Sequence, residues 1–169
     1  RLVADHDVFV YSRDESKQWS IKNDLLHRKT KTVSFFVGDV RDQKRLASVL
    51  RQVRPDVIIS AAALKQVDVC EINPDESVKT NLEGTRNVVD AVNEYGGDCT
   101  LLFVSTDKAC SPVNTYGMCK ALSERIVTSQ ARTGLHNIKY LCVRYGNVLE
   151  SRGSIIPLFR YKAENSEYL

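Results

Sequence analysis

Short apolar runs alternate with longer stretches of helical periodicity along the chain. The runs are rich in β-branched and aromatic residues and predict strands at residues 7–11, 32–39, 56–60, 99–105 and 139–145. The stretches between them predict helices at about residues 15–29, 41–54, 74–95 and 115–133. Because each strand candidate is almost continuously apolar, we expect a sheet that is covered on both faces.

This alternation predicts βαβ units and therefore an α/β fold built on a Rossmann-like, doubly wound parallel sheet. No repeat, low-complexity tract or linker divides the sequence, so residues 1–169 are interpreted as one NAD(P)-binding domain. In such sheets ligands bind beyond the carboxyl ends of the strands. Polar and charged residues follow every predicted strand, in the segments 12–15, 38–42, 61–65, 105–109 and 145–148.

A Gly-rich turn of the type GxGxxG, which cradles the pyrophosphate of a dinucleotide, does not precede the first predicted strand. The strand that leads into this turn lies in the middle of a doubly wound sheet, so a sheet without it has a gap flanked by unpaired backbone groups. We therefore expect residues 1–169 to form an incomplete sheet, lacking the first strand and the Gly-rich turn of a longer protein. Alone they should bind a dinucleotide weakly.

The composition is that of an ordered globular chain, with 43% hydrophobic and 27% charged residues. The formal charge of +3 is spread among acidic residues, so nucleic acid is not an expected partner, and a small molecule or a protein is. No apolar run approaches the roughly 20 residues of a membrane helix, and the first residues lack the layout of a signal peptide.

The cysteines are odd in number and form no CxxC pair; they are Cys70, Cys99, Cys110, Cys119 and Cys142. This pattern argues against both a disulfide framework and a zinc site, so no metal is predicted. Five partly buried free thiols in a reducing, cytoplasmic setting are the simplest interpretation.

The segment STDKACSPVNTYGMCK, residues 105–120, carries the densest chemistry. Tyr116 and Lys120 are four residues apart and so share one face of a helix, where the ammonium group can lower the pKa of the phenol from its usual value of about 10. The same ammonium can bind the ribose of a nicotinamide cofactor. Asp107 and Lys108 directly follow a buried strand, which favours a functional pair over a solvated turn.

Five segments together resemble the extended short-chain dehydrogenase/reductase superfamily, and within it the polysaccharide biosynthesis family of configuration-inverting UDP-N-acetylglucosamine 4,6-dehydratases. The segments are YSRDE, GDVRD, AAALKQVDVCEINPDESVKTNLEGTRNV, STDKACSPVNTYGMCK and RYGNVLESRGSIIPLF. The resemblance implies a lyase that oxidises the sugar at C4 by passing a hydride to the cofactor. The enzyme would then eliminate water across C5 and C6 and finally return the hydride to C6.

The resemblance also implies roles for the central residues. Tyr116 would be the base at the C4 hydroxyl, Lys120 would lower its pKa, and Thr106 would contact the sugar. Asp107 would protonate the departing C6 hydroxyl, and Lys108 would take the C5 proton. An ordinary reductase of this superfamily needs only a hydroxyl and the Tyr/Lys pair, so the Asp107-Lys108 pair favours a dehydratase.

The end of the first predicted strand bears on the choice of cofactor. NAD-specific folds place Asp or Glu there, whereas this chain has Ser12 and Arg13, and Arg13 can clamp a 2′-phosphate. NADP is therefore expected, and Asp14 keeps NAD open. Asp39 and Val40 match the adenine contacts of the family, although Asp39 can also be an exposed carboxylate at a strand end.

The remaining candidates are less specific. Small side chains after the third predicted strand either let the backbone approach the cofactor or serve close packing; they are Ala61, Ala62 and Ala63. Lys65 is equally suited to a phosphate, a sugar or neither. By resemblance, Asn81 would lie on the nicotinamide side of the cofactor. The residues that would contact the substrate are Asn147, Arg152 and Ser154.

Two other interpretations remain open from the sequence. In an epimerase or reductase of the same superfamily, Lys108 would only position the substrate. In a non-catalytic Rossmann-like module, the same edge would bind a nucleotide or a protein partner. For the dehydratase, a UDP-sugar is the expected substrate and the full-length protein is expected to be a homo-oligomer.

Overall fold

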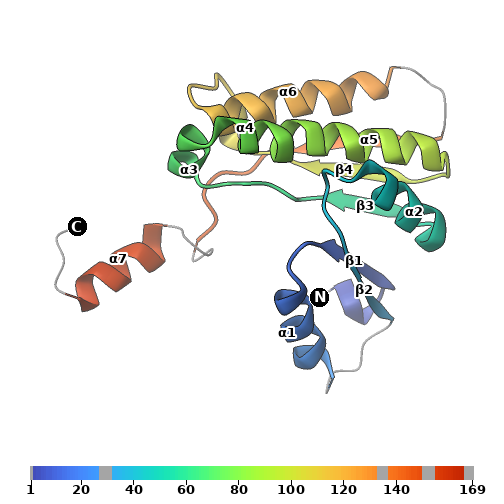
Figure 1. The fold of residues 1–169 in the computed structure, drawn as a ribbon, viewed down its shortest axis with the longest axis horizontal. Coiled ribbons are helices and arrows are strands. Elements are labelled where there is room, and N and C mark those ends of the chain that lie inside the picture. The colour runs from blue at the N-terminus through green and yellow to red at the C-terminus, as the bar shows by residue number, and fades with distance from the viewer. Residues whose placement is uncertain (1, 27–31, 133–136, 150–154, 166–169) are drawn as a thin grey trace.

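The computed structural model describes residues 2–26, 32–132, 137–149 and 155–165. Within these ranges the strands are β1 (Val8–Ser12), β2 (Val33–Val37), β3 (Val57–Ser60), β4 (Thr100–Val104) and β5 (Lys139–Val143). Every pairing is parallel: β1 pairs with β2, and β4 lies between β3 and β5 (Figure 1). The predicted α/β fold with a parallel sheet is thereby confirmed.

The helices alternate with the strands, as predicted. They are α1 (Glu15–Leu25), α2 (Gln43–Val53), α3 (Val67–Ile72), α4 (Pro74–Ser77), α5 (Gly84–Tyr95), α6 (Thr115–Gln130) and α7 (Ile155–Glu164). Short 3-10 turns occur at η1 (Leu2–Ala4) and η3 (Asp107–Ala109), and a π-helical turn, η2 (Val78–Glu83), joins α4 to α5. None of the helices in the described ranges is both long and apolar enough to cross a membrane.

Local sequence signals fix the ends of these helices. The carboxylates of Asp14 and Asp42 accept hydrogen bonds from the backbone N–H groups of Lys17 and Arg45, which caps the first turns of α1 and α2. Gly96 ends α5 in the left-handed conformation, with φ of 64°. A short polar residue thus satisfies the first turns of α1 and α2, and a glycine reverses the backbone at the end of α5.

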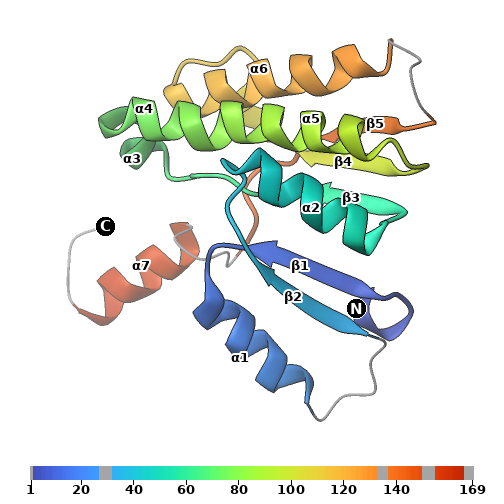
Figure 2. The ribbon, with the colours of Figure 1, turned by 45° about the vertical axis from the view of Figure 1, so that its right-hand side comes forward.

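One face of the β3–β4–β5 sheet carries the hydrophobic core. Figure 2 shows α2, α5 and α6 side by side over this face. The buried apolar side chains that fill the layer are Leu46, Ala47, Val88, Val89, Ala91, Val92, Cys99, Leu101, Phe103, Val127 and Ile138. Their burial orients the strands so that the carboxyl ends of β3, β4 and β5 meet at the edge where α6 begins.

The opposite face of this sheet differs from the sequence prediction. Val57 and Ile59 on β3 are 58% and 52% exposed, and Leu141 and Val143 on β5 are also exposed. In the part of the chain that the structure describes, no helix covers these side chains, so the strands are apolar on both faces but buried on one.

The sheet is also divided. β1 does not pair with β3, although Figure 2 shows β1 as the strand of its pair that lies nearer β3. Both strands therefore have one open edge among the described residues, which matches the gap expected in the middle of the sheet.

Candidate functional site

The segment that follows β4 is tied to the segment that follows β5. The backbone N–H of Asp107 donates to the carbonyl oxygen of Tyr145 at 3.0 Å, and Ser105 N donates to Val143 O at 2.7 Å. Thr106 caps η3, because its hydroxyl oxygen accepts a hydrogen bond from Lys108 N at 3.4 Å. The chain therefore turns sharply at the carboxyl end of β4 and presents Thr106, Asp107 and Lys108 there.

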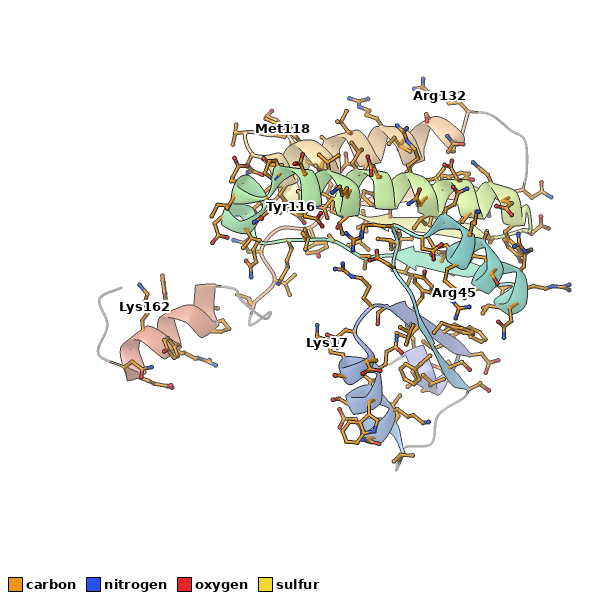
Figure 3. All side chains as sticks on the ribbon, viewed as in Figure 1. Lys17, Arg45, Tyr116, Met118, Arg132 and Lys162 are labelled. Carbon is orange, nitrogen blue, oxygen red and sulfur yellow. The ribbon has the colours of Figure 1, made fainter. Side chains whose placement is uncertain are left out.

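The first turn of α6 packs directly on η3. The Asn114 side chain accepts a hydrogen bond from Gly117 N at 2.8 Å and so caps the helix. A Cβ at Gly117 would lie 2.3 Å from the carbonyl oxygen of Lys108, so only glycine permits this approach. The contact brings Tyr116 to the same edge as Thr106, at the start of α6 (Figure 3).

Asp107 and Lys108 form an ion pair that is open to solvent. Lys108 Nζ lies 3.1 Å from Asp107 Oδ1. The Lys108 side chain is 35% exposed and the Asp107 side chain is 54% exposed. Lys108 Nζ also donates to Asn147 Oδ1 at 3.4 Å, and Thr106 Oγ1 donates to Asp107 Oδ1 at 2.9 Å. The hydrogen bonds from Lys108 and then from Thr106 lower the pKa of Asp107, so the carboxyl is ionised at neutral pH.

Tyr116 and Lys120 differ from the predicted arrangement. Both are buried, at 8% and 2% exposed, and burial is the largest cause that raises the pKa of Tyr116; a hydrogen bond with Thr106 opposes it. Lys120 Nζ donates instead to Val104 O at 2.8 Å and lies 4.4 Å from the ring centroid of Phe103. In this structure the Lys120 ammonium therefore points to β4. Contrary to the prediction, it does not lower the pKa of the Tyr116 phenol.

Burial lowers the pKa of Lys120 itself to about 8, and the nearby Glu124 carboxylate opposes that shift. Glu124, on the next turn of α6, was not identified from the sequence. Its carboxylate binds the Ser105 hydroxyl and the Arg144 guanidinium. The spacing YxxxKxxxE, residues 116–124, was the available signal, because residues four apart share a helix face.

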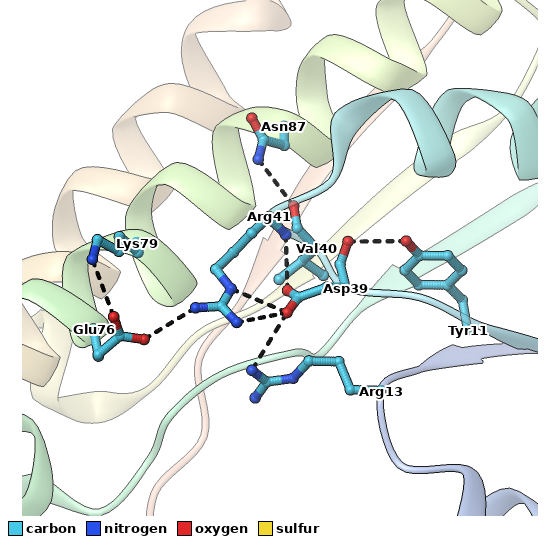
Figure 4. A network of polar contacts seen from close by, with 8 residues as sticks. All are labelled: Tyr11, Arg13, Asp39, Val40, Arg41, Glu76, Lys79 and Asn87. Carbon is cyan, nitrogen blue, oxygen red and sulfur yellow. Dashed lines mark hydrogen bonds and ion pairs between the residues drawn. The ribbon is translucent and has the colours of Figure 1, made fainter.

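The ends of β1 and β2 form a second polar cluster, drawn in Figure 4. Arg13 Nη1 lies 3.5 Å from Asp39 Oδ2, and the Arg13 side chain is 52% exposed. The Ser12 hydroxyl accepts a hydrogen bond from Gln18 Nε2 at 2.9 Å, and the Val40 carbonyl accepts one from Asn87 Nδ2 at 3.0 Å. The exposed guanidinium of Arg13 is chemically suited to a phosphate at this edge.

The guanidinium of Arg41 binds the carboxylate of Asp39. Its Nε and Nη2 donate to Asp39 Oδ2 at 3.0 and 2.9 Å, and its Nη1 donates to Glu76 Oε2 at 3.0 Å. Although burial opposes it, the hydrogen bonds from Arg41 lower the pKa of Asp39. Arg41 was overlooked in the GDVRD segment, and it leaves Asp39 less available to adenine than the sequence interpretation assumed.

Asn81 needs a correction. Its side chain is fully buried; Oδ1 accepts from Leu64 N at 2.8 Å, and Nδ2 donates to Leu64 O at 2.9 Å and to Ser77 Oγ at 3.2 Å. The amide is thus used within the protein. Asn81 supports the site by holding the loop after β3, and its side chain is not free for the predicted contact on the nicotinamide side.

The other candidates lie on loops at the same edge or outside the described ranges. Ala61 and Ala62 are exposed and Ala63 is half-buried, all on the loop after β3, and Lys65 and Asn147 are exposed. Arg152 and Ser154 lie outside the described residues.

In the described part of the chain, no cluster of three or more His, Cys, Asp or Glu side chains could hold a metal ion. The five cysteines are free thiols: Cys70, Cys99 and Cys119 are buried, Cys142 is half-buried, and Cys110 is exposed on the turn between η3 and α6.

The parallel strands, together with Thr106 after β4 and the Tyr116/Lys120 pair on α6, define a Rossmann fold of the short-chain dehydrogenase/reductase type. Residues 3–169 match the family described as polysaccharide biosynthesis protein, and the chain belongs to that family.

Two relatives illustrate the similarity. UDP-N-acetylglucosamine 4,6-dehydratase (inverting) from Campylobacter jejuni (strain 81-176) is 43% identical over 155 residues, which are 90% of this chain and 44% of that protein. UDP-glucose 4-epimerase from Rickettsia typhi is 41% identical over 165 residues, 96% of this chain and 46% of that protein. The chain therefore spans less than half the length of these relatives.

Solved structures agree with the fold. Pen from Bacillus thuringiensis superposes with a TM-score of 0.86 at 35% identity, covering 94% of this chain and 49% of that one. DesIV, a dTDP-glucose 4,6-dehydratase from Streptomyces venezuelae, gives a TM-score of 0.77 at 23% identity, covering 96% and 54% of the two chains.

Proposed function

We propose that the protein containing these residues is a nucleotide-sugar 4,6-dehydratase that converts UDP-N-acetylglucosamine to a UDP-4-keto-6-deoxy sugar with bound NADP, for polysaccharide or glycan biosynthesis. The observation that carries the proposal is the Asp107–Lys108 ion pair, at 3.1 Å, beside Thr106 and Tyr116 at one edge of the sheet. The 43% identity to an inverting dehydratase supports the same reaction.

The first step needs a base at the C4 hydroxyl. A bound nicotinamide would supply hydride transfer, taking hydride from C4 and later returning it at C6. Tyr116 takes the O4 proton, and Thr106, which is hydrogen-bonded to Tyr116, orients that hydroxyl. In the ligand-free site burial keeps the phenol protonated and the Lys120 ammonium donates to Val104 O, so the proposal requires that ligand binding turns this ammonium towards Tyr116, where its charge favours the phenolate.

The elimination step needs a base and an acid at once, and the Asp107–Lys108 pair can provide both. Transfer of one proton from Lys108 Nζ to Asp107 Oδ1 turns the ion pair into an amine and a carboxylic acid without exchange with solvent. The amine takes the C5 proton while the acid protonates the departing C6 hydroxyl, which leaves as water. As C6 is reduced, the Lys108 ammonium, whose protons exchange with solvent, gives a proton to C5, and the proton that Tyr116 took from O4 restores the charge of Lys108.

The test incubates the full-length protein with UDP-N-acetylglucosamine in deuterated water and follows the product by NMR. We expect a 4-keto-6-deoxy sugar with deuterium at C5. Asp107→Asn and Lys108→Met should each reduce this product about 100-fold or more, because each removes one proton carrier. Lys44→Met, an exposed lysine change on α2, is the matched control and should leave turnover unchanged.

A UDP-sugar 4-epimerase is the second candidate, because relatives at 41% to 43% identity bear that name. In that case Asp107 and Lys108 only position the substrate. A C4-inverted product that retains its C6 hydroxyl would support this candidate and overturn the dehydratase. Exchange at C5 without loss of water would also point to an epimerase, whereas nucleotide binding without turnover would indicate a non-catalytic module.

The choice of NADP rests on Arg13. In the full-length protein, Arg13→Ala should weaken NADP binding about tenfold or more and leave NAD binding nearly unchanged, because only NADP carries a 2′-phosphate. Titration of both cofactors at one salt concentration measures this. Equal losses for the two cofactors would remove the argument. A cytoplasmic location and a homo-oligomer belong to the same proposal, and fractionation and light scattering test them.

A further inference from the structure

A partly buried carboxylate, that of Glu124, lies one helical turn from the Tyr116/Lys120 pair. Glu124 is on α6, one turn beyond Lys120, and its side chain is 12% exposed. Its Oε1 accepts hydrogen bonds from Ser105 Oγ at 2.5 Å and from Arg144 Nε at 2.8 Å, and its Oε2 accepts one from Arg144 Nη2 at 2.6 Å. One side chain thus joins α6 to the residues that follow β4 and β5.

This junction adjoins the contact made by Lys120. Lys120 Nζ binds the carbonyl oxygen of Val104, and Glu124 binds the hydroxyl of the next residue, Ser105. Two successive turns of α6 therefore hold two successive residues at the end of β4. The next residue is Thr106, whose hydroxyl is hydrogen-bonded to Tyr116.

We propose that Glu124 is a positioning residue for the Tyr116/Lys120 pair: with Arg144 it fixes the end of β4 against α6, and its negative charge balances the buried ammonium of Lys120. Its link to catalysis rests on the proposed function, whereas its electrostatic link to Lys120 does not.

The charges around Lys120 make the second part testable. The titratable groups that act on its pKa are Glu124 on the same helix and the Cys142 thiol on β5, and Arg144 acts on Glu124. Burial lowers the pKa of Lys120 to about 8 in spite of Glu124, which raises it. The Arg144 hydrogen bonds are the largest cause that lowers the pKa of Glu124, so this carboxyl stays ionised at neutral pH.

The experiment titrates Lys120 directly by NMR in the full-length protein labelled with 13C at lysine Cε, with Lys120→Met identifying the signal. In Glu124→Gln, the Lys120 midpoint should fall by about one pH unit, because an anion is lost and Arg144 is left unbalanced. In Glu124→Asp, which keeps the charge, the midpoint should stay close to that of the parent.

The direction of the shift separates this role from a merely structural one. If Glu124 only held the fold, its loss would admit water to Lys120 and move the midpoint upward, towards the ordinary lysine value. An upward or absent shift in Glu124→Gln would therefore overturn the proposal. Glu124→Met, which also removes the charge and packs without a polar group, carries the same test if Glu124→Gln does not fold.

Activity provides the second measurement. Glu124→Gln should lower kcat about tenfold with little change in KM, and the alkaline limb of its pH profile should move down together with the NMR midpoint. A changed KM with an unmoved alkaline limb would oppose the proposal. If the parent protein shows no dehydratase turnover, the proposed function fails, and the NMR titration still decides the electrostatic role of Glu124.

Discussion

Lys120 illustrates how a single buried side chain at this site reduces the stability of the folded protein. Its ammonium is 2% exposed and has a carbonyl oxygen and an aromatic face as its described contacts. A buried cation without a carboxylate directly bound to it is unfavourable, which is why its pKa falls to about 8. Such a buried charge disfavours folding, and strongly shifted pKa values of this kind cluster at functional sites.

Replacement of Lys120 tests this through the pH dependence of unfolding. The folded-state pKa is depressed for a base, so between about pH 8 and 10.5 the unfolded chain binds a proton that the folded chain does not. The free energy of unfolding of the parent should therefore rise through this window by ~2 kcal/mol relative to Lys120→Met. Urea denaturation of both proteins at pH 7 and pH 10 measures the difference. Parallel changes in the two proteins would contradict the assignment.

At the scale of elements, the contact between η3 and α6 sets the geometry of the site. A methyl group at Gly117 would approach Lys108 O to 2.3 Å, and that oxygen belongs to the backbone, which cannot swing away. In the sequence, Gly117 is only one glycine within a predicted helix. The need for glycine at this position becomes visible when the turn after β4 is packed against the first turn of α6.

We predict that Gly117→Ala destabilises the protein by about 1–3 kcal/mol and lowers the proposed dehydratase turnover of the full-length protein, because it forces η3 away from α6. Thermal unfolding and product formation measure the two effects. Met118→Ala is the matched control, since the neighbouring Met118 side chain is 49% exposed. Equal behaviour of the two variants would show that the close approach has no consequence.

Strands and long helices could be predicted because their signals are local. The apolar run at 99–105 and the helical spacing at 74–95 needed no partner to be recognised. The π-helical turn η2 within residues 74–95 could not be predicted from the sequence. It contains Asn81, whose side chain binds the backbone of Leu64 on the loop after β3.

The candidate site follows the same division. The YxxxK spacing and the position after β4 singled out Tyr116 and Thr106, and the structure places these two side chains in hydrogen-bond contact. The sequence could not reveal that Arg41 would occupy Asp39, or that Lys120 would turn to Val104, because each outcome depends on side-chain rotamers in the folded chain.

At the scale of the whole molecule, one face of the β3–β4–β5 sheet is left uncovered by the described residues. Val57, Ile59, Leu141 and Val143 are all exposed, and β3 has an open edge among the described residues. Exposed apolar strands with free backbone groups are sites of association.

Residues 1–169 produced alone should therefore self-associate at micromolar concentration, and Ile59→Lys should shift them towards monomer, because a charge on this face opposes contact between sheets. Light scattering over a dilution series measures the change. Met118→Lys adds the same charge to the surface of α6 and should have little effect. An equal shift in both variants would attribute association to net charge alone.

The exposure of Cys110 offers a practical consequence. A maleimide fluorophore should couple at this thiol well before the buried ones react, with no cysteine removed. The dye would sit on the turn that separates Lys108 from Tyr116, where its emission can report in real time a ligand that binds at this edge of the sheet.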